Sequence, residues 1–277
     1  MPTKSTGTPS LFPEIEATRL LNPKEWIETC GFHDLTESEI LAEVTKRVKE
    51  HPAHPLVLLD LDSTLYEVQP RTHQIIKEWI ASAESSKFVS VKATLHKLTS
   101  DKLGYSLNDT FVNLGLSVAQ PEIKVAYDLL KRFWAKRFFD SSYLQFDVAY
   151  PGAVRFVQEL YELGAELVYL TGRDEPGMGH GTRQNLLRDG FPWDVARTHL
   201  LMKKSFELDD LEHKLAAGSY VRKHGTLIAS FENEPPNIVG LYDAFPEAMH
   251  VFVDTVCSDR PAIARHGLYR IGGFEFE

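Results

Sequence analysis

Cysteine is scarce in this chain, and its two occurrences exclude the commonest cysteine-based sites. Cys30 and Cys257 are the only cysteines among 277 residues, and no CxxC pair exists. A structural zinc site therefore has no signature here, and the eleven histidines show no HExxH spacing. Two reduced, buried thiols in a cytosolic protein are a simpler interpretation of the pair than a disulfide.

Positive charge and long apolar runs are also in short supply. The chain has 30 lysines and arginines but 39 aspartates and glutamates, which gives a formal net charge of -9. This balance argues against broad nucleic-acid binding, which requires a basic face, but it allows small anionic substrates where a metal ion reverses the local field. No run approaches the ~20 apolar residues of a membrane span, and the first residues lack the apolar stretch of a signal peptide. We expect a soluble, cytoplasmic protein with no membrane partner.

What the chain does contain is a set of short apolar runs separated by helical patterns. Runs of this kind, without alternation, are typical of strands buried on both faces of a parallel sheet. One intervening helix is predicted from Pro151, at its start, to Gly164, at its stop. Strand–helix alternation of this kind predicts a doubly wound α/β fold with a mainly parallel sheet. The predicted strands cover residues 55–60, 166–171, 226–231 and 249–254.

Two stretches depart from this alternation and suggest a division of the chain. Residues 70–147 carry helical patterns and no strand-like run, which predicts a helical cap inserted beside the core. Residues 1–54 are predicted to form an N-terminal helical extension. The α/β core is then assigned to residues 55–69 and 148–277.

Polar side chains stand where the predicted strands end. Asp60 and Asp62 follow the first strand, Thr171 and Gly172 close the second, and Glu232 follows the third. In an open parallel sheet, ligands bind at the carboxyl ends of the strands. Each feature alone is an ordinary strand end or turn, but together they predict one site that handles phosphate and a cation.

The segments DLDST (60–64), LTGR (170–173) and SFENEP (230–235) resemble, in order and context, three motifs of the haloacid dehalogenase-like superfamily, in particular its aspartate-based phosphatases. The resemblance covers the predicted core and not the N-terminal residues. It implies a Mg²⁺-dependent phosphatase that forms an aspartyl-phosphate before water releases the phosphate.

The resemblance also implies roles for individual residues. Asp60 would be the nucleophile and a metal ligand; Asp62 would be the general acid and base, with its carbonyl on the metal. Thr171 would hold the phosphoryl group, and Glu232 and Asn233 would complete the Mg²⁺ shell. The remaining phosphate-binding candidates are Leu61, Ser63, Thr64, Gly172 and Arg173.

The sequence leaves two assignments open, the lysine beside the nucleophile and the side chain that meets the metal. The family uses a lysine beside the nucleophile, and Lys214 fits its place best, with Lys203 and Lys204 as rivals. Glu232 stands where aspartate is commoner, which leaves open whether Glu232, Asn233 or Glu234 meets the metal. It also leaves room for a catalytically weak binding or regulatory protein.

Hydrolysis of a small phosphomonoester is the leading functional hypothesis, and a phosphotransferase or mutase is its alternative. An acid at Asp62 argues against dehalogenation.

The segment 177–182, GMGHGT, is interpreted as a mobile loop before a helix that begins at Arg183. The sequence predicts neither the identity of the substrate nor an oligomeric state.

Overall fold

A seven-stranded sheet forms the centre of the computed structural model, which describes residues 19–51 and 53–275. Its strand order is β2-β11-β9-β8-β3-β6-β7, and all its neighbouring strands pair in parallel. The prediction of a doubly wound, mainly parallel α/β fold is therefore confirmed. The strands are β2 Gly31–Phe32, β3 Pro55–Leu59, β6 Glu166–Asp174, β7 Thr198–Lys203, β8 Thr226–Glu232, β9 Met249–Val253 and β11 His266–Ile271.

Helices cover both faces of this sheet because its strands are apolar on both sides. All five residues of β3 are buried. One face packs against α2 (Glu37–Glu50), α7 (Ala153–Glu162) and α8 (Glu175–Asp189). The other packs against α9 (Asp210–Ala216), α10 (Gly218–His224) and α11 (Pro235–Ala244). From β3 the chain runs outward to β6 and β7, then returns to β8 on the other side of β3, so β3 lies at the switch point where such folds bind ligands.

The described part of the N-terminal segment contains strands as well as helices, and it packs as part of the core. It therefore differs from the expected helical extension. A capping box formed by Thr36 and Glu39 starts α2, whose buried side chains belong to the main core. Ahead of it, β2 pairs with β11, and the short strand β1 (Leu20–Leu21) pairs with β10 (Ala262–Ile263). Between β1 and β2, α1 (Pro23–Thr29) buries Trp26. Residues 1–18 of the predicted extension lie outside the described residues.

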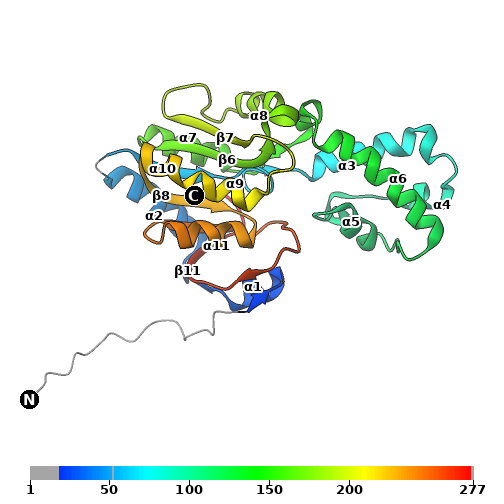
Figure 1. Ribbon diagram of the computed structural model, residues 1–277, viewed down its shortest axis with the longest axis horizontal. Helices are drawn as coiled ribbons and strands as arrows, with labels where there is room; N and C mark the ends of the chain where they lie inside the picture. The colour runs from blue at the N-terminus through cyan, green and yellow to red at the C-terminus, as the bar shows by residue number, and fades with distance from the viewer. Residues whose placement is uncertain (1–18, 52, 276–277) are drawn as a thin grey trace, which may run out of the picture.

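The residues between β3 and β6 include a separate helical lobe. Its helices are α3 (Gln69–Ala81), α4 (Val89–Leu95), α5 (Leu107–Asn113) and α6 (Pro121–Phe138), which share an apolar core of their own. Figure 1 shows them grouped to one side of the sheet. A two-stranded antiparallel ribbon, β4 (Tyr66–Glu67) with β5 (Val148–Ala149), joins this lobe to the core, and we call the lobe the cap. No helix of the described residues combines the length and apolarity needed to cross a bilayer.

The prediction of a mobile loop over residues 177–182 is wrong, because these residues form the start of α8. Asp174 caps the helix, and its carboxylate accepts a hydrogen bond from the Gly177 N–H at 2.8 Å. The glycines serve close packing: a Cβ on Gly181 would lie 2.3 Å from the Ser141 carbonyl oxygen. The segment 141–146, a 3₁₀ turn that follows the cap, thereby lies directly against α8.

We predict that Trp26→Ala lowers the free energy of unfolding by about 3–5 kcal/mol, the usual cost of removing a large buried aromatic side chain. The Trp26 ring is fully buried, its centroid lies 5.0 Å from that of Phe252 on β9, and its Nε1 donates to the Ile263 carbonyl at 3.1 Å. Urea unfolding measures the change. Leu20→Ala, at a side chain 60% exposed, is the control and should change stability by less than about 0.5 kcal/mol. Equal, small effects of both would contradict the assignment of this segment to the core.

Candidate functional site

Three polar groups are brought together by the order of the central strands. β3 lies between β6 and β8, so Asp60, Thr171 and Glu232 all stand at the same edge of the sheet. A cavity of about 460 Å³ opens over this edge, between the core and the cap. Of the predicted site residues, those that line it are Asp60, Asp62, Ser63, Gly172, Arg173, Lys214, Glu232, Asn233 and Glu234, together with Lys203.

Lys214 joins the first and third strand ends directly. Its Nζ donates to Asp60 Oδ1 at 2.7 Å and to Glu232 Oε2 at 2.5 Å. All three side chains are buried, with Lys214 4% exposed, Asp60 6% and Glu232 1%. The position of Lys214 follows from α9, which is capped by Asp209 and lies against α11 and β6.

The two rival lysines do not contact Asp60 or Glu232. Lys203 Nζ donates to the carbonyls of Phe206 and Leu208, at 3.1 and 2.8 Å, and to Asp210 Oδ1 at 2.8 Å. It therefore holds the loop between β7 and α9. Lys204 is exposed. Among the three candidates, Lys214 alone is placed to neutralise charge at Asp60.

This buried cluster is short of positive charge. Two carboxylates share a single ammonium. Burial is the main reason that the pKa of Asp60 is raised to about 7. The neighbouring Glu232 raises this pKa further, whereas Lys214 lowers it. Burial likewise raises the pKa of Glu232, while the paired carboxylates raise that of Lys214 despite its burial. An added cation would relieve this imbalance.

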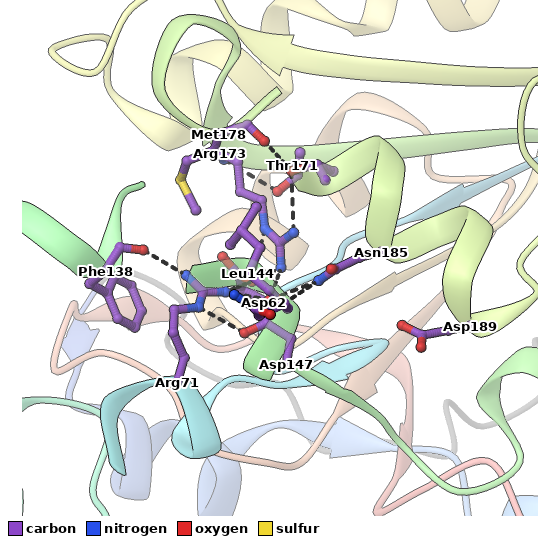
Figure 2. A network of polar contacts seen from close by, with 12 residues as sticks. Asp62, Arg71, Phe138, Leu144, Asp147, Thr171, Arg173, Met178, Asn185 and Asp189 are labelled. Atoms are coloured by element: carbon purple, nitrogen blue, oxygen red, sulfur yellow. Dashed lines mark hydrogen bonds and ion pairs between the residues drawn. The ribbon is translucent and has the colours of Figure 1, made fainter. Parts of the chain in front are cut away.

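Asp62 is held by two buried arginines, one from the cap and one from the core (Figure 2). Its Oδ1 accepts hydrogen bonds from Arg173 on β6, through Nε at 3.0 Å and through an Nη, and from Arg71 on α3 at 3.3 Å. Asp147, just before β5, bridges the same two guanidinium groups, at 2.6 Å to Arg71 and 2.9 Å to Arg173. The result is a network of two carboxylates and two guanidinium groups that spans the junction of cap and core.

The arginines also set the protonation state of Asp62. Burial raises its pKa, but the adjacent Arg173 and Arg71 outweigh this effect and lower the pKa to about 2. Asp62 is therefore an anion at neutral pH in this arrangement. The same guanidinium groups make Asp62 a weak base, so it can take up or donate a proton only after they withdraw.

Arg71 and Asp147 are two residues of this network that no sequence pattern predicts. Arg71 lies on the first cap helix and Asp147 in the returning linker, 76 residues further along the chain. Neither belongs to a motif, and they are brought together by the β4–β5 ribbon and by the packing of α3 against the 141–146 turn. The sequence predicts Arg173, which follows Thr171 and Gly172, as a phosphate-binding residue, whereas in the structure its guanidinium binds Asp62 and Asp147.

The other predicted phosphate-binding residues divide into two groups. Ser63 lines the cavity in a left-handed backbone conformation, with φ at 61°. Gly172 also lines it, and a Cβ there would lie 2.6 Å from Asp210 Oδ2 and would displace that carboxylate. Leu61, Thr64 and Thr171 are buried beneath the surface of the cavity instead. The Thr171 hydroxyl accepts a hydrogen bond from the Arg173 N–H at 3.2 Å.

The polar residues at the end of β8 have different hydrogen-bond partners, and Glu232 accepts from Lys214 and from the Glu234 N–H. Both carboxylate oxygens of Glu234 accept hydrogen bonds from Ser258, from its N–H at 2.9 Å and its hydroxyl at 2.5 Å. Asn233 Oδ1 accepts from the Thr64 hydroxyl at 3.2 Å, and its Nδ2 donates to the Val256 carbonyl. Asn233 is thus fixed with its carbonyl oxygen toward the β3 turn, which favours Glu232 and Asn233 over Glu234 as metal-binding candidates.

The donor set suits a hard divalent cation. Asp60, Glu232 and Asn233 all offer oxygen, the element that Mg²⁺ prefers, and they line one cavity. Among the described residues, no three His, Cys, Asp or Glu side chains form a metal cage by themselves, so a bound ion would also use the Asn233 amide, backbone carbonyls or water. The residues present therefore fit Mg²⁺, with the excess of buried negative charge as the supporting observation.

Comparisons with known proteins identify the family of the chain. The family model of haloacid dehalogenase-like hydrolases matches residues 54–203, and the chain belongs to this family. Solved structures with a similar fold include a hydrolase of the same superfamily, subfamily IA, from Geobacter sulfurreducens, 13% identical, with a TM-score of 0.46 over 80% of this chain and 93% of that one. Another, a superfamily hydrolase from Ehrlichia chaffeensis, is 10% identical, with a TM-score of 0.43 over 81% of this chain and 94% of that one. The search of curated proteins finds no match to the chain.

We predict that the metal-free protein loses stability as the pH rises from about 4 to about 7, and that Asp60→Asn removes part of this loss. The folded-state pKa of Asp60 is raised, so the folded protein binds this proton more tightly than the unfolded chain does. The stabilising proton is present at low pH and lost as the pH passes through about 7. Urea unfolding at pH 5 and pH 8, with chelator present, should show a smaller change for the variant, by on the order of a few kcal/mol. An identical pH dependence in both proteins would contradict the prediction.

Proposed function

We propose that the chain is a Mg²⁺-dependent phosphatase that hydrolyses a small phosphomonoester through an aspartyl-phosphate on Asp60. The observation that supports this most directly is the Asp60 carboxylate at the end of the central strand, facing a cavity and paired with Lys214 at 2.7 Å. A carboxylate in this place can attack phosphorus, while the ammonium neutralises charge that develops on the phosphoryl group.

The remaining groups supply the rest of the reaction. In the first half, a bond from Asp60 to phosphorus forms, the bond between phosphorus and the ester oxygen breaks, and Asp62 in its protonated form donates a proton to the leaving alcohol. In the second half, water attacks phosphorus, the bond from Asp60 to phosphorus breaks, and the Asp62 carboxylate, which lines the cavity, takes a proton from the water. Mg²⁺, held by Asp60, Glu232 and Asn233 and by the Asp62 carbonyl, would supply further neutralisation of the phosphate charge.

The first test is nucleophile removal. Asp60→Asn keeps the shape of the side chain but removes the attacking carboxylate, so we expect kcat for 4-nitrophenyl phosphate with Mg²⁺ to fall by at least about 10³-fold. Chelation should abolish the wild-type activity, and added Mg²⁺ should restore it. Free phosphate is measured with and without an added alcohol, because a phosphotransferase would yield phosphorylated alcohol instead. Substantial activity in Asp60→Asn would refute the nucleophile assignment.

The second test compares the contributions of Lys214 and Lys204 to activity. Lys214→Met removes the ammonium that touches Asp60 and Glu232, and we expect kcat to fall about 10²–10³-fold, the usual cost of removing one charge-stabilising donor. Lys204→Met, at an exposed side chain, is the matched control and should retain activity. Steady-state kinetics of both variants decides the matter, and equal activities would remove Lys214 from the mechanism.

A further inference from the structure

The two walls of the cavity differ in chemistry. The core wall carries the carboxylates and Lys214 described above. The cap wall contributes five aromatic side chains and no carboxylate; its single charged side chain is Lys131 on α6. The aromatic residues are Tyr105, Tyr127, Trp134, Phe138 and Phe139.

Part of this aromatic wall is continuous from the cap to the core. The Trp134 ring is stacked on Phe138, with centroids 4.3 Å apart and planes at 24°. Phe138 and Phe139 make an edge contact at 5.1 Å, and Phe139 makes another at 4.8 Å with Phe206, which lies on the core loop after β7. Phe206 is 53% exposed and lines the cavity, so its apolar surface is not explained by packing in the core.

These walls indicate which part of a substrate each could receive. The phosphoryl group belongs at the core wall, beside Asp60 and Lys214, so the leaving group must extend toward the cap. Aromatic side chains favour stacked or edge contacts with another ring, whereas a polyol would require a dense set of hydrogen-bonding groups. A volume of about 460 Å³ is in the range of small-molecule sites.

We propose that the leaving group of the substrate is an aromatic alcohol whose ring packs against Trp134, Phe138 and Phe206, and whose anionic substituent faces Lys131. This inference rests on the proposed phosphatase function and names the substrate class of the same site. Lys131 is suited to the anion because it is exposed, lines the cavity and forms no ion pair with the described residues. The products are then inorganic phosphate and the free aromatic alcohol, with water as the only other reactant.

The first experiment compares two esters in ring variants. With 4-carboxyphenyl phosphate, Trp134→Leu should lower kcat/KM by about tenfold, the upper range for loss of an aromatic pair, while Trp134→Phe should retain most of it. With glycerol 3-phosphate, which has no ring, both variants should match the wild type within about twofold. Phe206→Ala repeats the test at an exposed side chain, whose removal should leave the fold intact. Val195→Ala is its control, because Val195 is 48% exposed and does not line the cavity.

The second experiment tests the anionic substituent with two lysines of one helix. Lys131→Ala should raise KM for 4-carboxyphenyl phosphate several-fold and leave KM for phenyl phosphate unchanged, the scale expected for an exposed charge pair. Lys136→Ala is the matched control, because Lys136 is also exposed on α6 but does not line the cavity.

The outcomes distinguish the inference from the function on which it rests. Equal losses on both esters in Trp134→Leu, or unchanged kinetics in both Trp134→Leu and Phe206→Ala, would overturn the aromatic leaving group while Asp60-dependent hydrolysis stands. Equal effects of Lys131→Ala and Lys136→Ala would overturn the role of Lys131. Activity that survives Asp60→Asn would overturn the phosphatase function itself.

Discussion

The contact of one ammonium with two buried carboxylates is the interaction on which the site depends. Lys214 lies between Asp60 and Glu232, which come from adjacent strands of the sheet. Without Lys214, two carboxylates would be buried side by side with no cation, at a cost that usually forces one of them to take up a proton. The same pairing keeps Asp60 at the centre of the sheet edge, where an electrophile in the cavity can reach it. The charge that remains unbalanced is also the property that would attract a divalent cation.

A second buried network links this site to the cap. Arg71 and Arg173 are almost completely buried, and burial of such charges is costly unless they are fully paired. Asp62 and Asp147 provide this pairing, and Asn185 donates a further hydrogen bond to Asp147 at 3.3 Å. Because Arg71 belongs to the cap and Arg173 to the core, any displacement of the cap must alter the surroundings of Asp62. The protonation of Asp62 is thus tied to the position of the cap.

The core of the site could be predicted from the sequence because it follows from strand order. Buried runs that end in Asp60, Thr171 and Glu232 place these groups at one edge of any parallel sheet in which the strands are neighbours. Helical spacing similarly predicted the cap over residues 70–147, where the structure has its separate helical lobe. Local sequence patterns and one general rule of topology are sufficient to predict these features.

What the sequence did not predict depends on contacts between distant segments. β2 has two residues, too few for a period to be visible, and it joins the sheet only because β11 offers an edge. The glycines of residues 177–182 suggest a loop, yet packing against Ser141 overrides their low helix propensity. The Arg71–Asp147 pair joins two chain segments that meet through the β4–β5 ribbon, and no spacing encodes it.

The most direct measurement of the central claim is chemical trapping of the covalent intermediate. The enzyme is mixed with substrate and Mg²⁺, quenched during turnover and treated with borohydride, which reduces an acyl phosphate but not a free carboxylate. Peptide mass spectrometry then locates the modified residue. We predict reduction to homoserine at position 60 and nowhere else. Substrate-dependent reduction at another carboxylate, with Asp60 unmodified, would contradict it.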